Sequence, residues 1–255
     1  MNNNTLEILN NFKPIDLSEM ERVALMDRID SKYIFHSSQL NGFLNELKDS
    51  YDVLEVNDLR ISKYESLYYD TPNFDLYHYH QRGKFNRFKF RVRKYVESNL
   101  LFFEVKFKNN KGRTKKNRIV RETFDLESTQ QLTDFLNKHT HYTVNDLEEK
   151  IWVNYSRITL VNKIISERVT IDLNLTFIHD NDSQNMHEFI VAEVKQNKSS
   201  DSPFVQLMHK NHVREGSISK YCIGIMKLFP HLRSNNFKPF QINLNKISKL
   251  NIDNA

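Results

Sequence analysis

The sequence predicts an α+β fold: an eight-stranded antiparallel β-barrel, or tunnel, with helices packed outside it. Two observations lead to this prediction. Eight strand-like runs follow one another along the 255 residues, and turn residues join the central three into a meander of hairpins. Charged and apolar residues alternate along several runs with the period of two that places them on opposite faces of a strand. Eight strands can close into a barrel whose interior holds side chains or one small ligand.

The predicted elements follow in chain order. Strands are expected at 28–36, 61–69, 86–96, 100–108, 113–124, 151–162, 167–178 and 188–196. Apolar residues at helical spacing predict helices over 38–47, 128–137, 203–211 and 218–229, and shorter helices are expected around 17–25 and 77–80. We expect an N-terminal arm over residues 1–26, one tunnel domain over 27–232, and a C-terminal tail over 233–255.

Composition narrows the class of protein. The single cysteine, Cys222, excludes an internal disulfide framework and fits a reducing compartment. The first residues show neither the basic nor the apolar region of a signal peptide. No apolar run approaches the roughly 20 residues that cross a bilayer. These features predict a cytoplasmic protein.

Positive charge is concentrated in one block of the chain. Residues 82–121 hold fifteen Lys and Arg against two acids, Glu97 and Glu104, a net charge of +13. Because the whole chain carries +5, the remaining residues carry −8. Such a concentration indicates a polyanionic partner.

Strand alternation places many charged residues on shared faces. The groups that share a face are Arg87, Lys89, Arg91 and Arg93; Glu104, Lys106 and Lys108; Arg28, Asp30 and Lys32; Arg168, Thr170, Asp172 and Asn174; and Glu193 and Lys195. One such strand alone would be a strand with a solvated charged face. Five of them, with helices covering the apolar faces, predict a basic, water-filled lumen. Acids such as Asp30 and Glu193 would lie among the bases there and could hold a divalent cation.

The motifs of the chain resemble those of a known family. They are DRIDSKYIF, SLYYDTPNFDLYHYH, FNRFKFRVRKY, FFEVKFKNNKGRTKKNR, YSRITL, RVTID, AEVKQ and SISKY. Their order is similar to that in the VTC domain, the polyphosphate polymerase domain of the triphosphate tunnel metalloenzyme, or CYTH-like, superfamily. The resemblance spans roughly residues 26 to 229 and rests on the combination of motifs.

The resemblance implies an activity and a set of site residues. It implies transfer of the γ-phosphoryl group of a nucleoside triphosphate, with ATP as the expected donor, to a growing polyphosphate chain inside the tunnel. The residues that match phosphate-contacting catalytic positions are Lys32, Arg91, Arg93, Lys106, Lys116, Arg157 and Lys220. Glu193 matches the acid that binds Mn²⁺ or Mg²⁺, and Asp172 and Glu104 are alternative metal ligands. Arg28, Lys89, Arg118, Arg168 and Lys195 are expected to bind substrate.

The chain departs from the family pattern at two places. Triphosphate-hydrolysing relatives open the first strand with Glu-x-Glu-x-Lys, where this chain has Arg28, Asp30 and Lys32. Losing one carboxylate and gaining a base favours chain binding over two-metal hydrolysis. Ser217 stands where the pattern Lys-Phe-Ser-Lys has its first lysine, which would weaken the grip on one phosphate.

Other functions stay open from the sequence. The same tunnel could serve a triphosphatase or a cyclase acting on nucleoside or inorganic triphosphate. A non-catalytic protein that binds polyphosphate or nucleic acid is the alternative of another class. Single-strand binders stack bases on aromatic side chains within a basic groove. Here the aromatic residues alternate opposite to the bases, so no nucleic acid is expected. The sequence identifies neither a membrane-protein partner nor an oligomeric state.

Overall fold

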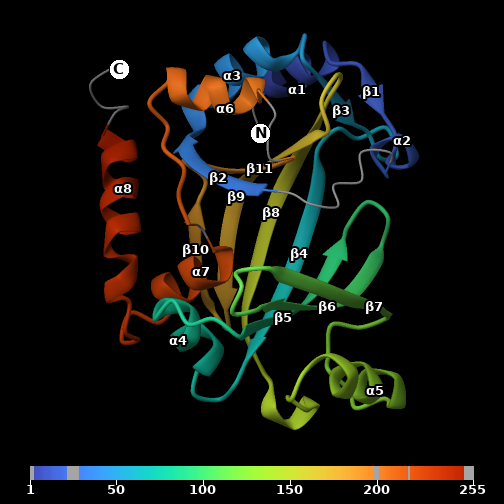
Figure 1. The fold of residues 1–255 in the computed structure, drawn as a ribbon, viewed down its shortest axis with the longest axis vertical. Coiled ribbons are helices and arrows are strands. Elements are labelled where there is room, and N and C mark those ends of the chain that lie inside the picture. Colours follow the sequence, from blue (N-terminus) through green and yellow to red (C-terminus); the bar gives the residue numbers. More distant parts are fainter. Residues whose placement is uncertain (1–2, 22–28, 198–200, 218, 250–255) are drawn as a thin grey trace.

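One large β-sheet organises the molecule. The computed structural model describes residues 3–21, 29–197, 201–217 and 219–249 (Figure 1). The main path of the sheet has the order β2-β11-β9-β8-β4-β5-β6-β7, and every neighbouring pair along it is antiparallel. Outside this path, β1 and β3 pair in parallel, β3 also pairs with β8, and β10 pairs with β9.

The elements have the following bounds. The strands are β1 Pro14–Ile15, β2 Ile29–His36, β3 Tyr51–Leu54, β4 Ser62–Asp70, β5 Arg87–Tyr95, β6 Leu100–Lys108, β7 Thr114–Arg121, β8 Glu148–Asn162, β9 Glu167–His179, β10 Asp182–Met186 and β11 Phe189–Gln196. The α-helices are α1 Asn3–Asn10, α2 Leu17–Glu21, α3 Leu40–Leu47, α4 Asp75–Gln81, α5 Gln130–His139, α6 Pro203–Lys210, α7 Lys220–Leu228 and α8 Lys238–Lys249. Short 3₁₀ turns occupy Ser37–Gln39, Val144–Asp146 and Asn235–Phe237.

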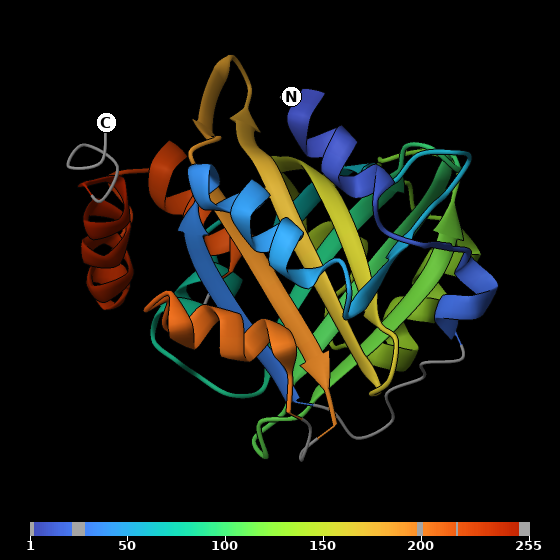
Figure 2. The same cartoon turned by 90° about the horizontal axis from the view of Figure 1, so that it is seen from above.

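The expected closed barrel is wrong in one respect. The eight predicted strands form the main path of the sheet, but among the described residues no pairing joins its ends, β2 and β7. The sheet instead curves round so that its two arms face each other (Figure 2). The sheet stays open partly because another segment of the chain covers the edge of β2 that does not pair with β11. The backbone N–H of Gly216 donates to the carbonyl of Lys32 at 2.8 Å, and Tyr33 bridges to Glu215.

Helices cover the outer, apolar face of the sheet in two groups. Helices α1, α3 and α6 pack over β2, β11, β9 and β8, where buried residues such as Phe35, Ile171 and Val194 meet Leu44 and Phe204 (Figures 1 and 2). Helix α5 packs over β5 and β6 in the same way. Because alternate residues face opposite sides of a strand, the charged residues are turned to the inner side, which we call the concave face.

Helix α7 covers part of the concave face. Its buried residues, including Ile223 and Ile225, pack against Ile151, Val153 and Phe177 on β8 and β9. The fit at Gly224 is close: a Cβ atom there would lie 2.5 Å from Cδ1 of Ile151 and 2.7 Å from Cδ1 of Phe177. Any larger side chain at Gly224 would therefore displace the helix or its neighbours.

A bulge in β9 changes the predicted alternation. The pairing of β8 with β9 shifts register between Asn154 and Ser156, opposite Asn174, which has a φ of 55°. Asn174 is therefore exposed and does not share the face of Asp172, as the plain alternation had predicted. Beyond the bulge, Leu175 turns inward and is fully buried in the cluster with α7.

The sequence did not predict α1, α8, β1, β3 or β10. These elements lie at the ends of the chain or are short, where periodic signals are weakest. None of the helices in the described part of the chain is long and apolar enough to span a membrane.

Candidate phosphate-binding site on the concave face

The structure brings almost all the predicted site residues to the concave face. The strand residues on it are Lys32, Lys89, Arg91, Arg93, Glu104, Lys106, Lys116, Arg118, Arg157, Arg168, Asp172, Glu193 and Lys195, as the strand register shows. Lys220 reaches the same face from the first residue of α7. Arg28 lies outside the described residues. Bases outnumber acids on this face, so it attracts anions.

Glu104 on β6 holds two bases. The register pairs it with Arg91 on β5 and Arg118 on β7. Its carboxylate accepts from Nε of Arg91 at 2.6 Å and forms a second ion pair with Lys116. Burial alone would raise the pKa of Glu104, but the charges of Arg91, Arg93 and Lys116 lower it well below its usual range. Glu104 is therefore a fixed anion that orients Arg91 and Lys116.

Asp172 on β9 holds a second pair of bases. Arg157 donates to both of its oxygens, at 2.6 and 2.9 Å, and Nζ of Lys220 lies 2.5 Å from Oδ2. Burial opposes ionisation, yet Arg157 and Lys220 lower the pKa of Asp172 to about 2. Asp172 thus fixes the N-terminal end of α7 to the sheet through Lys220.

Glu193 on β11 is held more loosely. Its carboxylate lies 3.4 Å from Nζ of Lys32 and 3.6 Å from Nζ of Lys195. Its side chain is 23% exposed, whereas those of Glu104 and Asp172 are 0% and 2% exposed. Although burial favours the neutral acid, neighbouring lysines keep the pKa of Glu193 well below its usual range. Glu193 is therefore an ionised carboxylate on this face with room for a further ligand.

The charges that act on Lys106 show that the two arms of the sheet lie near each other across the concave face. It lies on β6, but the charges that act on it include Glu193 and Lys195 of β11 as well as Arg91. Burial and the charge of Arg91 lower the pKa of Lys106 well below its usual value, and Glu193 opposes this. Among the described residues, Lys106 makes no hydrogen bond or ion pair. Its ammonium group can therefore be stabilised by an added anion.

Two stacked tyrosine rings contact the guanidinium groups of Arg93 and Arg157. The rings of Tyr64 and Tyr155 stack with centroids 5.2 Å apart. The guanidinium of Arg93 lies 5.4 and 5.5 Å from these two centroids, and that of Arg157 lies 5.0 and 5.3 Å from them. At such distances the face of an aromatic ring attracts a cation. The tyrosine pair therefore restricts where the two arginines can point.

A buried carboxylate links α4 to α7. Asp70 accepts backbone N–H groups of Thr71, Leu76 and Tyr77, and the hydroxyl of Tyr221 donates to it at 2.5 Å. The Tyr221 ring stacks on Tyr68, whose hydroxyl accepts from Arg91 at 2.9 Å. Helix α7 is thus fastened at one end to α4 and, through Tyr68, to the basic side chains.

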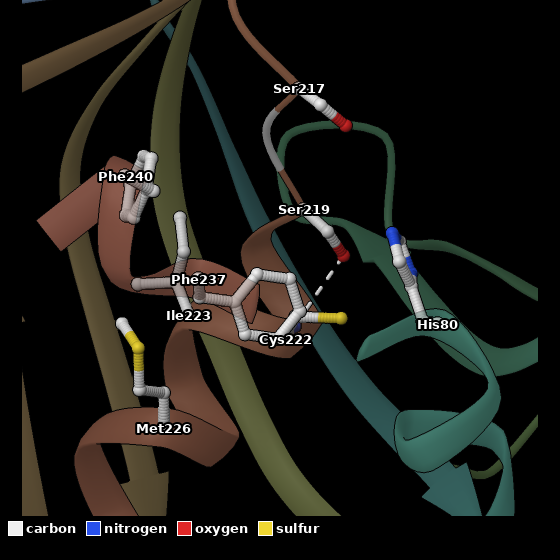
Figure 3. Close-up of a pocket in the computed structure, with 8 residues that line it drawn as sticks. All are labelled: His80, Ser217, Ser219, Cys222, Ile223, Met226, Phe237 and Phe240. Carbon is white, nitrogen blue, oxygen red and sulfur yellow. Dashed lines mark hydrogen bonds between the residues drawn. The ribbon is translucent and has the colours of Figure 1, made fainter. Parts of the chain in front are cut away.

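The margin of the site is a small pocket at the N-terminal end of α7 (Figure 3). Polar side chains of His80, Ser217 and Ser219 line it together with Cys222 and Phe237. The hydroxyl of Ser219 accepts from Lys89 at 2.9 Å and from the backbone N–H of Cys222. Burial and the charges of Lys89 and Arg87 lower the pKa of His80 to about 2, so this imidazole stays neutral.

The carboxylates of the concave face differ in how well they could hold a metal ion. Among the described residues, no group of three His, Cys, Asp or Glu side chains could hold a metal ion by itself. Glu104 and Asp172 are each occupied by two bases at short distance. Glu193 is ionised and accessible, and Mg²⁺-type ions are commonly held by one or two carboxylates together with substrate phosphates. The residues therefore fit a cation shared between Glu193 and a bound phosphate.

Comparisons with known proteins show the family of the chain. The VTC domain family model matches residues 27–229, so the chain belongs to the VTC domain family. A comparison with curated proteins found no match. The crystal structure of a "putative adenylate cyclase" from Bacillus halodurans is similar over 80% of this chain and 100% of that chain, with a TM-score of 0.52 and 11% identity. HpAC1 from Hippeastrum, described with a dominant triphosphatase activity, is similar over 78% and 95%, with a TM-score of 0.45 and 12% identity.

Sequence reasoning missed the groups that support the bases. Tyr64, Ser66 and Tyr68 recur with a period of two in one predicted strand, which places them on the same face as the arginines. That signal was present in the sequence. The Asp70–Tyr221 contact joins residues 151 positions apart, and no local pattern announces it.

Proposed function

We propose that this chain is a polyphosphate polymerase. It transfers the γ-phosphoryl group of a nucleoside triphosphate, with ATP as the expected donor, to a growing polyphosphate chain on the concave face. The observation that carries the proposal is the surplus of bases on that face, where each of three carboxylates already contacts two bases. Lys106, Arg93 and Lys89 remain for an anion with several phosphates. Membership of the VTC domain family supports this choice.

The side chains suit phosphoryl transfer. This reaction depends mainly on positioning and on neutralising the charge of phosphate oxygens. Arginines such as Arg91 and Arg93 offer paired donors in a fixed geometry, and lysines such as Lys106 act as compact charges. The acceptor is itself an ionised phosphate, so a strong general base is not required.

A divalent cation completes the proposal. Glu193 would hold Mn²⁺ or Mg²⁺, with Lys32 and Lys195 shifting from the carboxylate toward phosphate oxygens. The cation supplies further neutralisation of charge on the transferred group. Asp172 and Glu104 would act differently, by orienting Arg157, Lys220, Arg91 and Lys116.

The test uses purified protein incubated with ATP and Mn²⁺. Long phosphate chains should form together with nucleoside diphosphate. Free phosphate as the main product would instead support a triphosphatase, and a cyclic nucleotide with pyrophosphate would support a cyclase. If the protein makes none of these but binds polyphosphate, it is a non-catalytic binding protein and the proposal is wrong.

A competition experiment separates polyphosphate from nucleic acid. Labelled short polyphosphate is bound at one salt concentration, because salt weakens binding of every polyanion. Unlabelled polyphosphate should displace it far better than single-stranded DNA of equal charge, since polyphosphate presents its charges at closer spacing to the clustered bases, whereas DNA separates its phosphates by sugars. Equal displacement by the two competitors would support a nucleic-acid binder.

A further inference from the structure

A second basic surface lies outside the concave face, at the turn that joins β6 to β7. Lys111, Arg113 and Lys115 are exposed, and so is Lys84 in the loop before β5. No Asp or Glu occurs from Val105 to Arg121, so none lies next to this turn in the sequence. None of these four bases forms an ion pair within the described part of the chain. We call these four residues the outer basic surface.

The outer basic surface continues the rows of bases on the concave face. The register pairs Lys106 with Lys89. The next pair toward the turn whose side chains face the same side of the sheet is Lys108 with Arg87. Two strand residues advance about 7 Å, and Lys108 is the last residue of β6 before the turn. Nη1 of Arg87 donates to the carbonyl of Lys84. A path of positive charge therefore leads without interruption from Lys106 to the turn.

Lys108 joins the inner and outer groups. Its Nζ atom lies 5.9 Å from the ring of Phe85, which is 53% exposed and follows Lys84 in the loop. Burial and the charges of Arg87 and Lys32 lower the pKa of Lys108. An anion that reaches this position would relieve the repulsion among these three bases. The same anion would be within reach of the exposed bases at the turn.

The occupant must be a long polyanion. A single triphosphate is matched by the inner bases, whereas the path from Lys106 through Lys108 to Lys111 and Arg113 extends past the end of β6. A second copy of this chain is a poor occupant, because pairing two β7 edges would bring Lys115, Lys116 and Arg118 against like charges. A chain of phosphates carries charge at every unit and can follow the whole path.

We propose that the outer basic surface binds the part of the polyphosphate chain that extends beyond the concave face. This inference rests on the proposed function, because it takes polyphosphate as the ligand of the inner site. The surface retains a long chain between additions of phosphate and so favours long products. Short phosphates bind only the inner bases and do not depend on it.

The test compares two triple variants of equal net charge. K111Q/R113Q/K115Q removes bases of the outer basic surface. The turn is held by bonds from the backbone of Lys111 and Arg113 to Asn109, which these substitutions leave in place. K138Q/K246Q/K249Q removes three exposed lysines of α5 and α8 instead. Equilibrium binding of labelled tripolyphosphate and of long-chain polyphosphate is measured without ATP, over a series of salt concentrations.

The first variant should bind long-chain polyphosphate about tenfold more weakly, about 1.4 kcal/mol, and tripolyphosphate as before. Its slope of log affinity against log salt should fall by about two, since each lost contact removes roughly 0.7. The control variant should match the unmodified protein. With ATP and Mn²⁺, the first variant should make shorter chains at an unchanged initial rate.

Other outcomes decide against one proposal or both. Unchanged affinity of the first variant for long chains would overturn the outer site and leave the proposed function standing. If the first variant binds long chains more weakly but the unmodified protein makes no polyphosphate, the outer site stands and the proposed polymerase activity is refuted. Binding of neither phosphate by the unmodified protein would refute both. A larger loss toward single-stranded DNA or anionic lipid vesicles than toward polyphosphate would show that this surface takes another anion.

Discussion

The concave face has two parts that differ sharply although they lie on the same strands. In the charged part, bases surround Glu104, Asp172 and Glu193. In the other part, apolar side chains pack against α7. The boundary is narrow: Ile34 lies two residues beyond Lys32 on β2, and Val191 lies two residues before Glu193 on β11.

The comparison shows how one face serves two purposes. The apolar part stabilises the fold, because side chains such as Ile151, Val153 and Ile223 leave water when α7 packs. In the charged part the like charges repel one another and add little stability. A bound anion would relieve this repulsion. Lys220 stands at the boundary, at the start of the helix that covers the apolar part and in contact with Asp172 of the charged part. The packing of α7 therefore fixes one of the proposed phosphate ligands.

The largest effect is expected at Glu193. Glu193→Gln keeps the shape of the side chain and removes the charge that would hold a cation, so turnover with ATP and Mn²⁺ should fall by about 100-fold or more. Polyphosphate binding without metal should stay or strengthen, because Lys32 and Lys195 lose an acidic neighbour. Glu188→Gln, at an exposed acid near the start of the same strand, is the control. Unchanged turnover with an unchanged Mn²⁺ requirement would move the metal site to Asp172 or Glu104.

The next effect tests the two faces of β5. Arg91→Ala and Arg93→Ala should each weaken polyphosphate binding by about 10- to 150-fold, because a hydrogen bond to a charged group contributes about 1.5–3 kcal/mol. Lys94→Ala, on the outer face of the same strand, should leave binding nearly unchanged. Thermal unfolding of the Arg91→Ala variant must be measured as well as its binding. This substitution also leaves Glu104 with one base fewer and could lower stability. Arg93 hydrogen-bonds Ser66 instead, so its variant reports on binding more directly. Equal losses from Arg93 and Lys94 would contradict the assignment of faces.

A third prediction tests the apolar part alone. Gly224→Ala should destabilise the fold by about 1–3 kcal/mol, because the new Cβ meets Ile151 and Phe177 at very short distance and the core must move. Gly42→Ala is the matched control: no atom lies within 4 Å of its added Cβ, and it lies inside α3. That variant should be neutral or more stable by up to about 1 kcal/mol. Denaturant unfolding of both variants gives the comparison. Equal stability of the two would show that α7 does not pack closely on β8 and β9.

The smallest effect concerns pH and the charged part. Burial lowers the pKa of Lys116 to about 8, and Glu104 opposes this shift. Lys116 is therefore charged below pH 8 and loses its proton above it. Bound phosphate favours the charged form, so affinity should fall as pH rises from 7 to 9, by at most about tenfold per pH unit for one group. Lys116→Arg keeps its charge throughout and should reduce this dependence, leaving the part due to Lys106. An identical pH profile in the variant would exclude Lys116 as a phosphate ligand.

The strands of the sheet could be predicted from the sequence, but the closure of the sheet and the bulge in β9 could not. The eight main strands were predicted within a few residues, because hydrophobic alternation and turn residues are local signals. The closed barrel was not found, since closure depends on whether β2 and β7 reach each other, and the segment around Gly216 occupies the edge of β2 instead. The bulge at Asn174 was also missed, although it decides that Leu175 points inward.

Apart from the bulge in β9, the sequence alone determined which residues of a strand share a face. Arg91, Arg93, Lys106 and Glu193 lie on the concave side because the direction of a side chain along a strand is set by its own backbone. Only the tertiary structure decided which of them meet. The proximity of Lys106 to Glu193, the stacking of Tyr64 and Tyr155 beneath two arginines, and the contact of Asp70 with Tyr221 join distant positions of the chain. Such contacts depend on the curvature of the whole sheet, which arises from the packing of every layer at once and is not written in any single strand.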